Sequence, residues 1–254
     1  MTLVWRPGFQ FDADASTYIE AVEAADTQAL ETGVRYAIND FVIGCKNDGI
    51  WDAIKASCIL AGARTLSGAL VPLVGTAPTN FNFVSGDYDR ETGLKGNGST
   101  KYLDSNRTNN ADPQNSKHLS TFVTQKGTNT GILIGTDDPG GGSRIVSHVS
   151  SGNSSYSINT SSFKYVLGTG LSDFVGASRS SSVLTDFRYS NGLVDSTSDS
   201  SETPSSLNVL VFRRNNGFHT NARLAFYSIG ESLDLAALDT RVSNLITAIG
   251  AAIP

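Results

Sequence analysis

A long succession of short, β-like runs separated by turn residues constrains this chain more than any other feature, and it begins near Phe81. Within these runs the hydropathy alternates with a period of two, as it does in strands with one buried face. The expected strands are 101–103, 118–125, 131–135, 143–149, 156–159, 164–167, 172–178, 183–189, 193–196, 208–213 and 223–229. No helical pattern separates them, so the spacing predicts an antiparallel β-sandwich or barrel rather than a parallel α/β sheet.

Turn residues support this division into strands. Asn191-Gly192 is the strongest hairpin signal, because both residues tolerate positive φ in a two-residue turn. The glycine-rich stretch at 138–142 and the segment 151–153 also have the composition of turns.

The chain before residue 75 has a helical pattern instead. Apolar residues recur at steps of three or four, which places them on one helix face, at Tyr18, Val22, Ala25, Ala29, Gly33, Ala37 and Phe41. We expect this helix to end at Gly44 and a second one, with Trp51, Ile54, Cys58 and Ala61 on one face, to run from Asp48 to Gly62. The two would form a helical hairpin after an extended N-terminal arm over the first ten residues, which offers Val4, Phe9 and Phe11 for packing. Pro72, Gly75 and Pro78 indicate a crossover, and 233–249 has the apolar spacing of a C-terminal helix.

The change of pattern predicts two parts: an arm with a helical hairpin over residues 1–75, and a sandwich with its terminal helix over residues 76–254. The hairpin carries more apolar surface than it can cover alone. We therefore expect residues of this region to pack on the sandwich and also to form an attachment or oligomer surface. The candidates for that surface are Val34, Ile38, Phe41, Trp51 and Ile54.

Charge and hydropathy exclude several classes of function. Only 17% of the residues are charged and the net charge is -5, so there is no clustered basic surface for nucleic acid. No apolar run is long enough for a membrane span, and the first residues lack the pattern of a signal peptide. We expect folding in the cytoplasm. Cys45 and Cys58 lie in apolar surroundings and are expected to be two buried thiols, with a Cys45–Cys58 bridge as the alternative.

Catalytic patterns are not found in the sequence. The paired carboxyl groups of a glycoside hydrolase are missing from the strands, because no Glu occurs between Glu91 and Glu202. The three histidines lie far apart without ligand partners at metal spacing, and no serine stands in a nucleophile elbow. Asp137 and Asp138 could wrap a calcium ion, but a turn with Asx-type hydrogen bonds explains them as well. We expect a non-enzymatic protein with no cofactor and no metal.

A sugar site is the one ligand site for which the residues offer candidates. Such a site needs an exposed aromatic ring with Asn or Asp side chains nearby, and Tyr156, Tyr189 and Phe218 stand near loops rich in Asn and Ser. Both tryptophans, Trp5 and Trp51, lie outside the sandwich, and aromatic residues on strands are more often core than surface.

Three segments carry a resemblance to a known family. GLKGNGSTKYL at 93–103 and RLAFYSIGESL at 223–233 resemble the start and the end of concanavalin A-like (laminin G-like) jelly-roll domains of tailed-bacteriophage structural proteins. FVIGCKNDGIWDAIKASC at 41–58 resembles the helical lead-in of such proteins. The resemblance implies a mainly β jelly-roll fold and a virion context, as a tail fibre, a tail appendage or a capsid decoration protein. It supplies no ligand motif.

Three hypotheses follow. The first is a non-enzymatic virion structural protein, assembled in the host cytoplasm, that uses residues 1–75 to attach to other virion proteins or to its own copies, as the trimer that the resemblance implies. The second is a lectin-like adhesin that binds glycans of the host surface. The third is a depolymerase, which the missing carboxylate pair disfavours.

Overall fold

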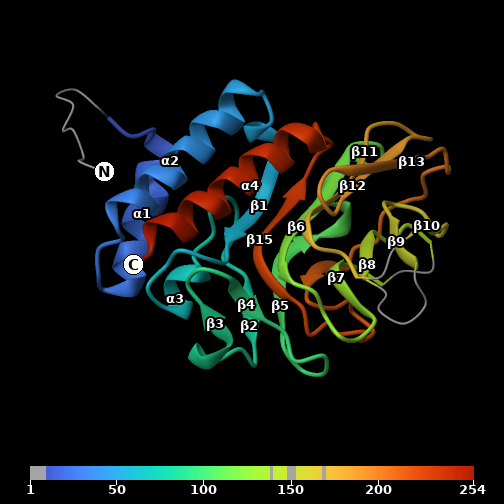
Figure 1. Cartoon of the computed structure of the whole chain (residues 1–254). Helices are drawn as coiled ribbons and strands as arrows, with labels where there is room; N and C mark the ends of the chain where they lie inside the picture. Colours follow the sequence, from blue (N-terminus) through green and yellow to red (C-terminus); the bar gives the residue numbers. More distant parts are fainter. Residues whose placement is uncertain (1–9, 138–139, 148–152, 168–169) are drawn as a thin grey trace.

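The computed structural model of the protein describes residues 10–137, 140–147, 153–167 and 170–254. Two antiparallel sheets face each other, and helices cover the outer face of one of them (Figure 1). The helices are α1 (Ala13–Asp26), α2 (Thr32–Asn47), α3 (Leu66–Ala69) and α4 (Leu235–Ala252), with single-turn 3-10 helices at Trp51–Ala53, Ser85–Asp87 and Asn109–Ala111. The predicted mainly β sandwich of jelly-roll type, with N-terminal helices and a C-terminal helix, is confirmed.

The larger sheet has eight strands in the order β13-β12-β11-β6-β15-β4-β3, and β1 also pairs with β15. Its members are β1 (Ile54–Ile59), β3 (Tyr88–Asp89), β4 (Gly93–Lys95), β6 (Lys117–Gln125), β11 (Asp173–Arg179), β12 (Thr185–Tyr189), β13 (Leu193–Thr197) and β15 (Arg223–Gly230). The hairpin predicted at Asn191-Gly192 joins β12 and β13. Its loop has three residues rather than two, because Tyr189 pairs with Leu193 and Ser190 also takes a positive φ, of 40°.

The second sheet has seven strands in the order β10-β9-β8-β7-β14-β5-β2. They are β2 (Thr79–Phe81), β5 (Tyr102–Thr108), β7 (Gly131–Gly135), β8 (Arg144–Ser147), β9 (Asn153–Ser157), β10 (Lys164–Leu167) and β14 (Asn208–Val211). One core fills the space between the sheets. Leu103, Ile145 and Val166 enter it from this sheet, and Leu119 and Val175 from the other.

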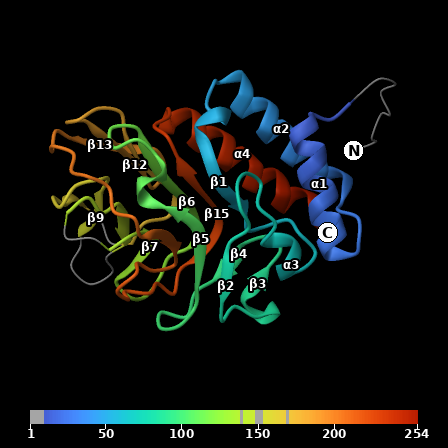
Figure 2. The ribbon, with the colours of Figure 1, turned by 180° about the vertical axis from the view of Figure 1, so that it is seen from behind.

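A second core lies between the larger sheet and the helices. Figure 2 shows α1, α2 and α4 together beside β1 and β15. Phe41 of α2 meets Phe226 of β15 edge to face, with ring centroids 5.8 Å apart. Phe174, Val34 and Leu238 belong to the same buried cluster. Residues 10–75 are therefore joined to the sandwich by a shared core, and the boundary expected at residue 75 falls after β1, a strand of the sandwich sheet.

The expected helical hairpin is partly wrong. The first helix is interrupted at Thr27, which takes a left-handed φ of 54° and ends α1, so that α2 begins only at Thr32. The second helix, expected from Asp48 to Gly62, is instead a 3-10 turn followed by β1. Almost every residue of β1 is buried, because one face meets the helices and the other meets the sandwich core. The helix was predicted because Trp51, Ile54, Cys58 and Ala61 have helical spacing, although Lys55 and Ser57 alternate with the apolar residues of the strand.

The attachment surface needs the same correction. Val34, Ile38, Phe41 and Ile54 are all buried, with at most 3% of their surface exposed, so they form core rather than a free surface. Trp51 alone remains partly exposed, beside a cavity of about 250 Å³.

The expected N-terminal arm is described only from residue 10, because residues 1–9 lie outside the described part of the chain. Phe11 packs against Tyr36, with ring centroids 5.3 Å apart. Cys45 and Cys58 are buried free thiols, as expected, and not a bridge.

The glycines that open the sandwich have a steric role. Gly93 has a φ of +95°, and a Cβ on it would lie 2.2 Å from the carbonyl oxygen of Leu224 in β15. A Cβ on Gly96 would lie 2.2 Å from the carbonyl oxygen of Thr220. The absence of side chains at both positions lets this segment lie directly against the chain that enters β15.

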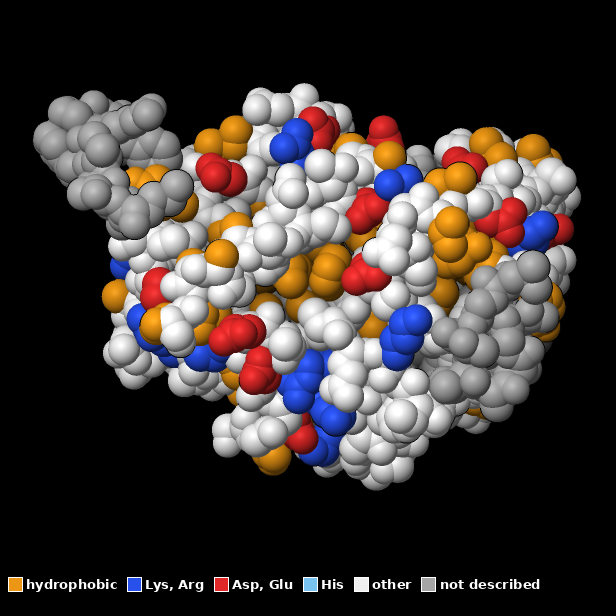
Figure 3. All heavy atoms as spheres, in the orientation of Figure 1, with side chains coloured by type: hydrophobic (Ala, Val, Ile, Leu, Met, Phe, Trp, Pro, Cys, Tyr) orange, Lys and Arg blue, Asp and Glu red, His pale blue; other side chains and the backbone are white. Residues whose placement is uncertain are grey.

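The surface agrees with the low content of charged residues. In the space-filling view, uncharged polar side chains and backbone predominate, with Lys, Arg, Asp and Glu scattered among them (Figure 3). Across the described residues, no helix combines the length and the hydropathy that a membrane span requires.

Candidate functional site

A cavity of about 200 Å³ lies on the outer face of the seven-stranded sheet. Its floor is a row of residues that are direct neighbours across four strands: Ile132 pairs with Val146, Val146 with Ser155, and Ser155 with Tyr165. They share one face because side chains alternate along a strand. The intervening residues, Ile145, Tyr156 and Val166, point into the sandwich core.

The tight turn at Arg214–Gly217 supplies one wall. Its ends exchange backbone hydrogen bonds, from Arg214 N–H to the Gly217 carbonyl at 3.2 Å and from Gly217 N–H to the Arg214 carbonyl at 3.1 Å. Phe218 follows with a φ of 58°, an unusual conformation for an aromatic residue. Its carbonyl accepts a hydrogen bond from Ile132 N–H at 2.9 Å, which fixes the turn beside the floor.

Phe163 and Arg144 also line the cavity. Three aromatic side chains at the cavity are unusually exposed: Phe163 by 37%, Tyr165 by 59% and Phe218 by 56%. Each phenylalanine lies against a guanidinium. The central carbon of Arg144 is 4.1 Å from the ring centroid of Phe163, and that of Arg214 is 4.4 Å from the ring centroid of Phe218. Cation–π contacts at these distances hold the rings in place.

Asp137 connects the two arginines. Its Oδ1 accepts from Nη1 of Arg144 at 3.3 Å and also from Nη1 of Arg214. The backbone N–H of Asp137 donates to Oδ1 of Asn215 at 3.0 Å. This hydrogen bond fixes Asp137 relative to the turn at Arg214–Gly217. The calcium alternative for Asp137 is disfavoured, because its carboxylate already pairs with two cations, while Asp138 lies outside the described residues. Nowhere in 10–137, 140–147, 153–167 or 170–254 do three His, Cys, Asp or Glu side chains gather as a metal site.

Such an arrangement suits a ligand with flat apolar patches and hydroxyl groups. Exposed aromatic rings offer apolar faces, and hydrogen-bonding groups at the rim of a cavity fix the orientation of a ligand. Because the floor is part of a sheet and the turn is hydrogen-bonded to it, the cavity is formed before a ligand arrives.

The three aromatic residues expected at a sugar site do not lie together. Tyr156 is fully buried and its ring stacks on Phe187 with centroids 4.2 Å apart, so it belongs to the core and the expectation is wrong for this residue. Burial raises the pKa of its hydroxyl group. Tyr189 is half-buried, and its ring stacks on the same Phe187, at 4.9 Å, on the other sheet. Only Phe218 lines the cavity.

Phe163 and Tyr165 were missed in the sequence. The exposure of Tyr165 could have been predicted from the sequence, because Tyr165 lies next to the buried Val166 in a correctly predicted strand, and neighbouring residues of a strand point to opposite faces. Phe163 precedes that strand and has no periodic pattern of its own.

Larger hollows lie between α4 and the hairpin of β12 and β13. They measure about 620 and 490 Å³ and meet at Arg188, whose Nε donates to Asp239 Oδ2 of α4 at 2.6 Å. Asp186, Asp195 and Asp234 line the larger one. Its lining includes one aromatic residue, Phe187, which is buried, so this groove lacks the exposed rings of the smaller cavity.

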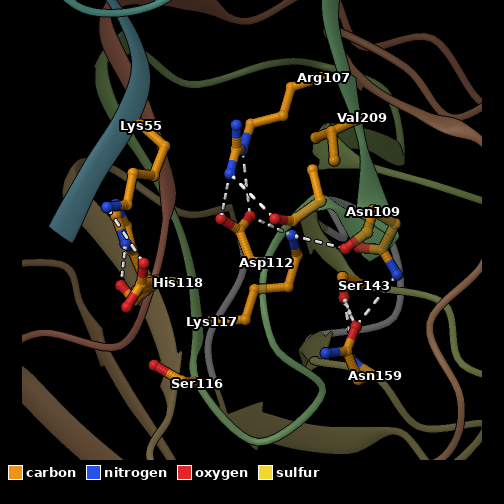
Figure 4. A network of polar contacts seen from close by, with 12 residues as sticks. Lys55, Arg107, Asn109, Asp112, Ser116, Lys117, His118, Ser143, Asn159 and Val209 are labelled. Atoms are coloured by element: carbon orange, nitrogen blue, oxygen red, sulfur yellow. Dashed lines mark hydrogen bonds and ion pairs between the residues drawn. The ribbon is translucent and has the colours of Figure 1, made fainter.

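A network of polar contacts lies inside one end of the sandwich (Figure 4). Lys117 donates through Nζ to Asp112 at 2.9 Å and to the carbonyl of Asn109 at 3.1 Å, and Arg107 donates to the same carboxylate through Nε at 3.2 Å. His118 points to the other face of β6, where its ring nitrogens contact Ser228 and the Glu231 carbonyl. Asp112, Lys117 and His118 are buried, so they support the fold and do not face a substrate.

Comparison with known proteins shows the fold. No protein-family model and no curated protein sequence matches the chain. Among solved structures, a mutant of HCR/D superposes with a TM-score of 0.51 at 11% identity, over 74% of this chain and 51% of that one. The binding domain of botulinum neurotoxin serotype D gives 0.47 at 11% identity, over 78% and 51%. Domain 4 of AbnA, a GH43 extracellular arabinanase from Geobacillus stearothermophilus, in complex with arabinotriose, gives 0.45 at 13% identity, over 66% and 82%. The chain thus spans about half the length of the first two structures, and its likeness to the HCR/D mutant is one of fold alone.

Proposed function

We propose that this protein is a non-catalytic, lectin-like binding module that recognises surface carbohydrate through the cavity lined by Phe163, Tyr165 and Phe218. The observation that carries the proposal is the exposure of three aromatic rings around one pre-formed cavity on the outer face of the seven-stranded sheet. The likeness to the HCR/D mutant is one of fold alone, so the proposal depends on the cavity itself.

The site gathers three exposed aromatic rings around one cavity and holds two of them against guanidinium groups. Phe218 has a positive φ and lies under the Arg214 guanidinium. Strained residues at the rim of a cavity point to binding rather than to folding. A sugar ring that stacks on Phe218 or Tyr165 would cover apolar surface and leave its hydroxyl groups at the rim, near Ser155, Thr130 and the two arginines.

The contribution of Phe218 can be estimated. A fully covered aromatic side chain buries roughly 150–250 Å². Because 56% of Phe218 is exposed, a sugar on one ring face would remove about 50 Å² from water. At roughly 25 cal/mol per Å² this is worth about 1.3 kcal/mol, or about tenfold in Kd.

A glycan array tests the proposal, with the full chain compared with Phe218→Ala, Tyr165→Ala and a matched control. Leu193→Ala is that control, because Leu193 is 55% exposed and lies on β13 of the other sheet. We expect the wild type and Leu193→Ala to bind the same glycans, and each aromatic variant to bind about tenfold more weakly. A protein that binds no glycan, or whose Phe218→Ala variant binds as well as the wild type, refutes the proposal.

The binding role is proposed to be free of hydrolysis. The described lining of the cavity consists of arginines, hydroxyl groups, aliphatic side chains and aromatic rings. Hydrolysis of a glycoside needs two carboxyl groups across the sugar. Prolonged incubation with a bound polysaccharide should release no reducing ends, and measurable release would contradict this part.

A virion location is a second proposal, and it rests on the sequence resemblance. The segments 93–103 and 223–233 that carry the resemblance include β4, the start of β5 and all of β15, and β4 pairs with β15 in the larger sheet. We propose that the module is displayed on a tailed-phage particle as a homotrimer. Analytical ultracentrifugation should then give a trimer, and an image reconstruction of the particle should contain this fold. A stable monomer would refute the trimer, and a reconstruction without the fold would refute the location.

A further inference from the structure

We infer that the ligand of this cavity is the end of a linear glycan chain, with at least two of its sugar rings bound together. The inference rests on the proposed function and adds the class of carbohydrate, which is a chain rather than a single sugar. It follows from the placement of the aromatic rings and of the turn at Arg214–Gly217.

The aromatic rings form two separate platforms. Phe163 and Tyr165 lie together, with ring centroids 6.4 Å apart. Phe218 lines the same cavity, but among the described residues its ring contacts the Arg214 guanidinium and no other aromatic ring. A ligand that covers both platforms must therefore reach across the cavity.

The two platforms lie at opposite ends of the floor. Tyr165 belongs to β10, whereas the hydrogen bond from Ile132 N–H to the Phe218 carbonyl, of 2.9 Å, holds Phe218 beside β7. In the sheet, β9 and β8 lie between these strands. Neighbouring strands are about 4.8 Å apart, so the two ends are separated by about 14 Å. A sugar ring is similar in size to a phenyl ring, so one sugar covers one platform and a second sugar is needed for the other.

The floor between the platforms offers little surface of its own. Ile132, Val146 and Ser155 are nearly buried, whereas the three aromatic side chains are exposed. The apolar area that a ligand removes from water therefore lies on the rings, and affinity depends on how many of them it covers.

The turn closes the β7 end of the cavity. On its far side it packs against Tyr102, where the central carbon of Arg213 is 4.5 Å from the ring centroid and the His219 ring is 6.0 Å away. The turn thus fills the space between the cavity and Tyr102, and a chain that stacks on Phe218 ends there.

The β10 end of the cavity is open. Among the described residues β10 is the outermost strand of its sheet, and Tyr165 on it is exposed. A glycan chain whose last sugar stacks on Phe218 would therefore cover Tyr165 with an inner sugar and leave the protein over β10.

Titration calorimetry with a ladder of chain lengths tests this inference. The ligands are fragments of one to five sugars, released by partial acid hydrolysis from the linear glycan that binds best on the array and separated by size. Affinity should rise about tenfold from the single sugar to the trisaccharide, because a second ring is covered, and then stay level. The intact glycan should bind one protein molecule per chain, whatever its length, because only the chain end fits.

Substitutions at the two ends of the cavity test whether one ligand covers both. With the trisaccharide, Phe218→Ala and Tyr165→Ala should each bind about tenfold more weakly, and their losses should multiply in the double variant. With the single sugar, at least one of the two variants should bind within about twofold of the wild type.

Phe81→Ala is the matched control. Phe81 is a partly exposed aromatic residue of the same sheet, on β2, and its ring stacks on Tyr102 beyond the turn, with centroids 4.3 Å apart. Its loss should leave the binding of every fragment unchanged.

The outcomes separate the inference from the proposed function. Equal affinity for the single sugar and the trisaccharide, or a single sugar that loses affinity in both variants, overturns the inference while the lectin-like function stands. Several protein molecules on one chain, or weaker binding by Phe81→Ala, also overturns it, because the ligand would then extend past the turn. Binding of the trisaccharide that neither Phe218→Ala nor Tyr165→Ala weakens overturns both proposals, since the sugar would lie elsewhere.

Discussion

Substitution of Asp112 by asparagine should destabilise the protein strongly, because it removes a buried counterion without changing the shape of the side chain. The carboxylate is fully buried and lies within 2.9 Å of the Lys117 ammonium group, which is itself fully buried. Asp112→Asn leaves this ammonium group in the protein interior with no opposite charge. Breaking a buried ion pair from one side typically costs about 3–5 kcal/mol, a large part of the roughly 5–15 kcal/mol that stabilises a folded domain.

The pKa of Asp112 agrees with this role. Burial alone would raise it, but the hydrogen bonds and charges of Arg107 and Lys117 outweigh the burial and lower it. A lowered pKa in the folded state means that the ion pair stabilises the protein above the unfolded pKa of Asp, about 3.9. That stability is lost as the pH falls through the folded value.

Urea unfolding followed by far-UV circular dichroism at pH 7 measures the effect. With a slope of about 3 kcal/mol per molar urea, the midpoint of Asp112→Asn should fall by about 1 M or more. Asp52→Asn is the matched control, because Asp52 is exposed, and its midpoint should stay near that of the wild type. Adding Lys117→Met to Asp112→Asn removes the stranded charge and should restore much of the loss. A loss below about 1 kcal/mol in Asp112→Asn, or no recovery in the double variant, would refute the reasoning.

Two further predictions concern stability. Burial lowers the pKa of His118 to about 4, below the unfolded value of about 6.5. Unfolded chains therefore bind the proton more readily, and stability falls as the pH drops from 6.5 towards 4, by about 2 kcal/mol at pH 5. His118→Gln should lack this dependence when its unfolding free energies at pH 7 and pH 5 are compared with those of the wild type, and an equal dependence in both would contradict it. Gly93→Ala should lower the melting temperature by several degrees, because its Cβ would lie 2.2 Å from a backbone oxygen, at a cost of about 2 kcal/mol or more. Gly86→Ala, with nothing within 4 Å of its Cβ, should change little, and similar shifts in the two variants would count against the close-packing account.

The sandwich could be predicted from the sequence because its strands are short and each is bounded by turn residues. The predicted runs 131–135 and 164–167 coincide with β7 and β10. The strand β1 could not be predicted in this way. Its two faces meet two different cores, and Ile54 and Cys58 also fit a helical spacing with Trp51 and Ala61, which concealed the alternation with Lys55 and Ser57. The apolar stripe of Val34, Ile38 and Phe41 was visible, but α4, which packs on α2, follows about 200 residues later in the chain.

The candidate site depends on features that local sequence does not contain. Its floor joins Ile132, Val146, Ser155 and Tyr165, and their alignment depends on the register of four strands. Phe218 was predicted because it lies in a loop rich in polar residues. Tyr156 was predicted as a sugar-binding residue for the same reason, but its side chain points to the core face of its strand and stacks on Phe187. A shift by one residue decides between the two faces of a strand.

The crystal structure of the full chain soaked with its best array ligand tests the central claim most directly. The account predicts a sugar ring stacked on Phe218 or Tyr165, in the cavity between the Arg214 turn and Phe163. A sugar bound in the groove between α4 and β12, or anywhere else away from these rings, would contradict it.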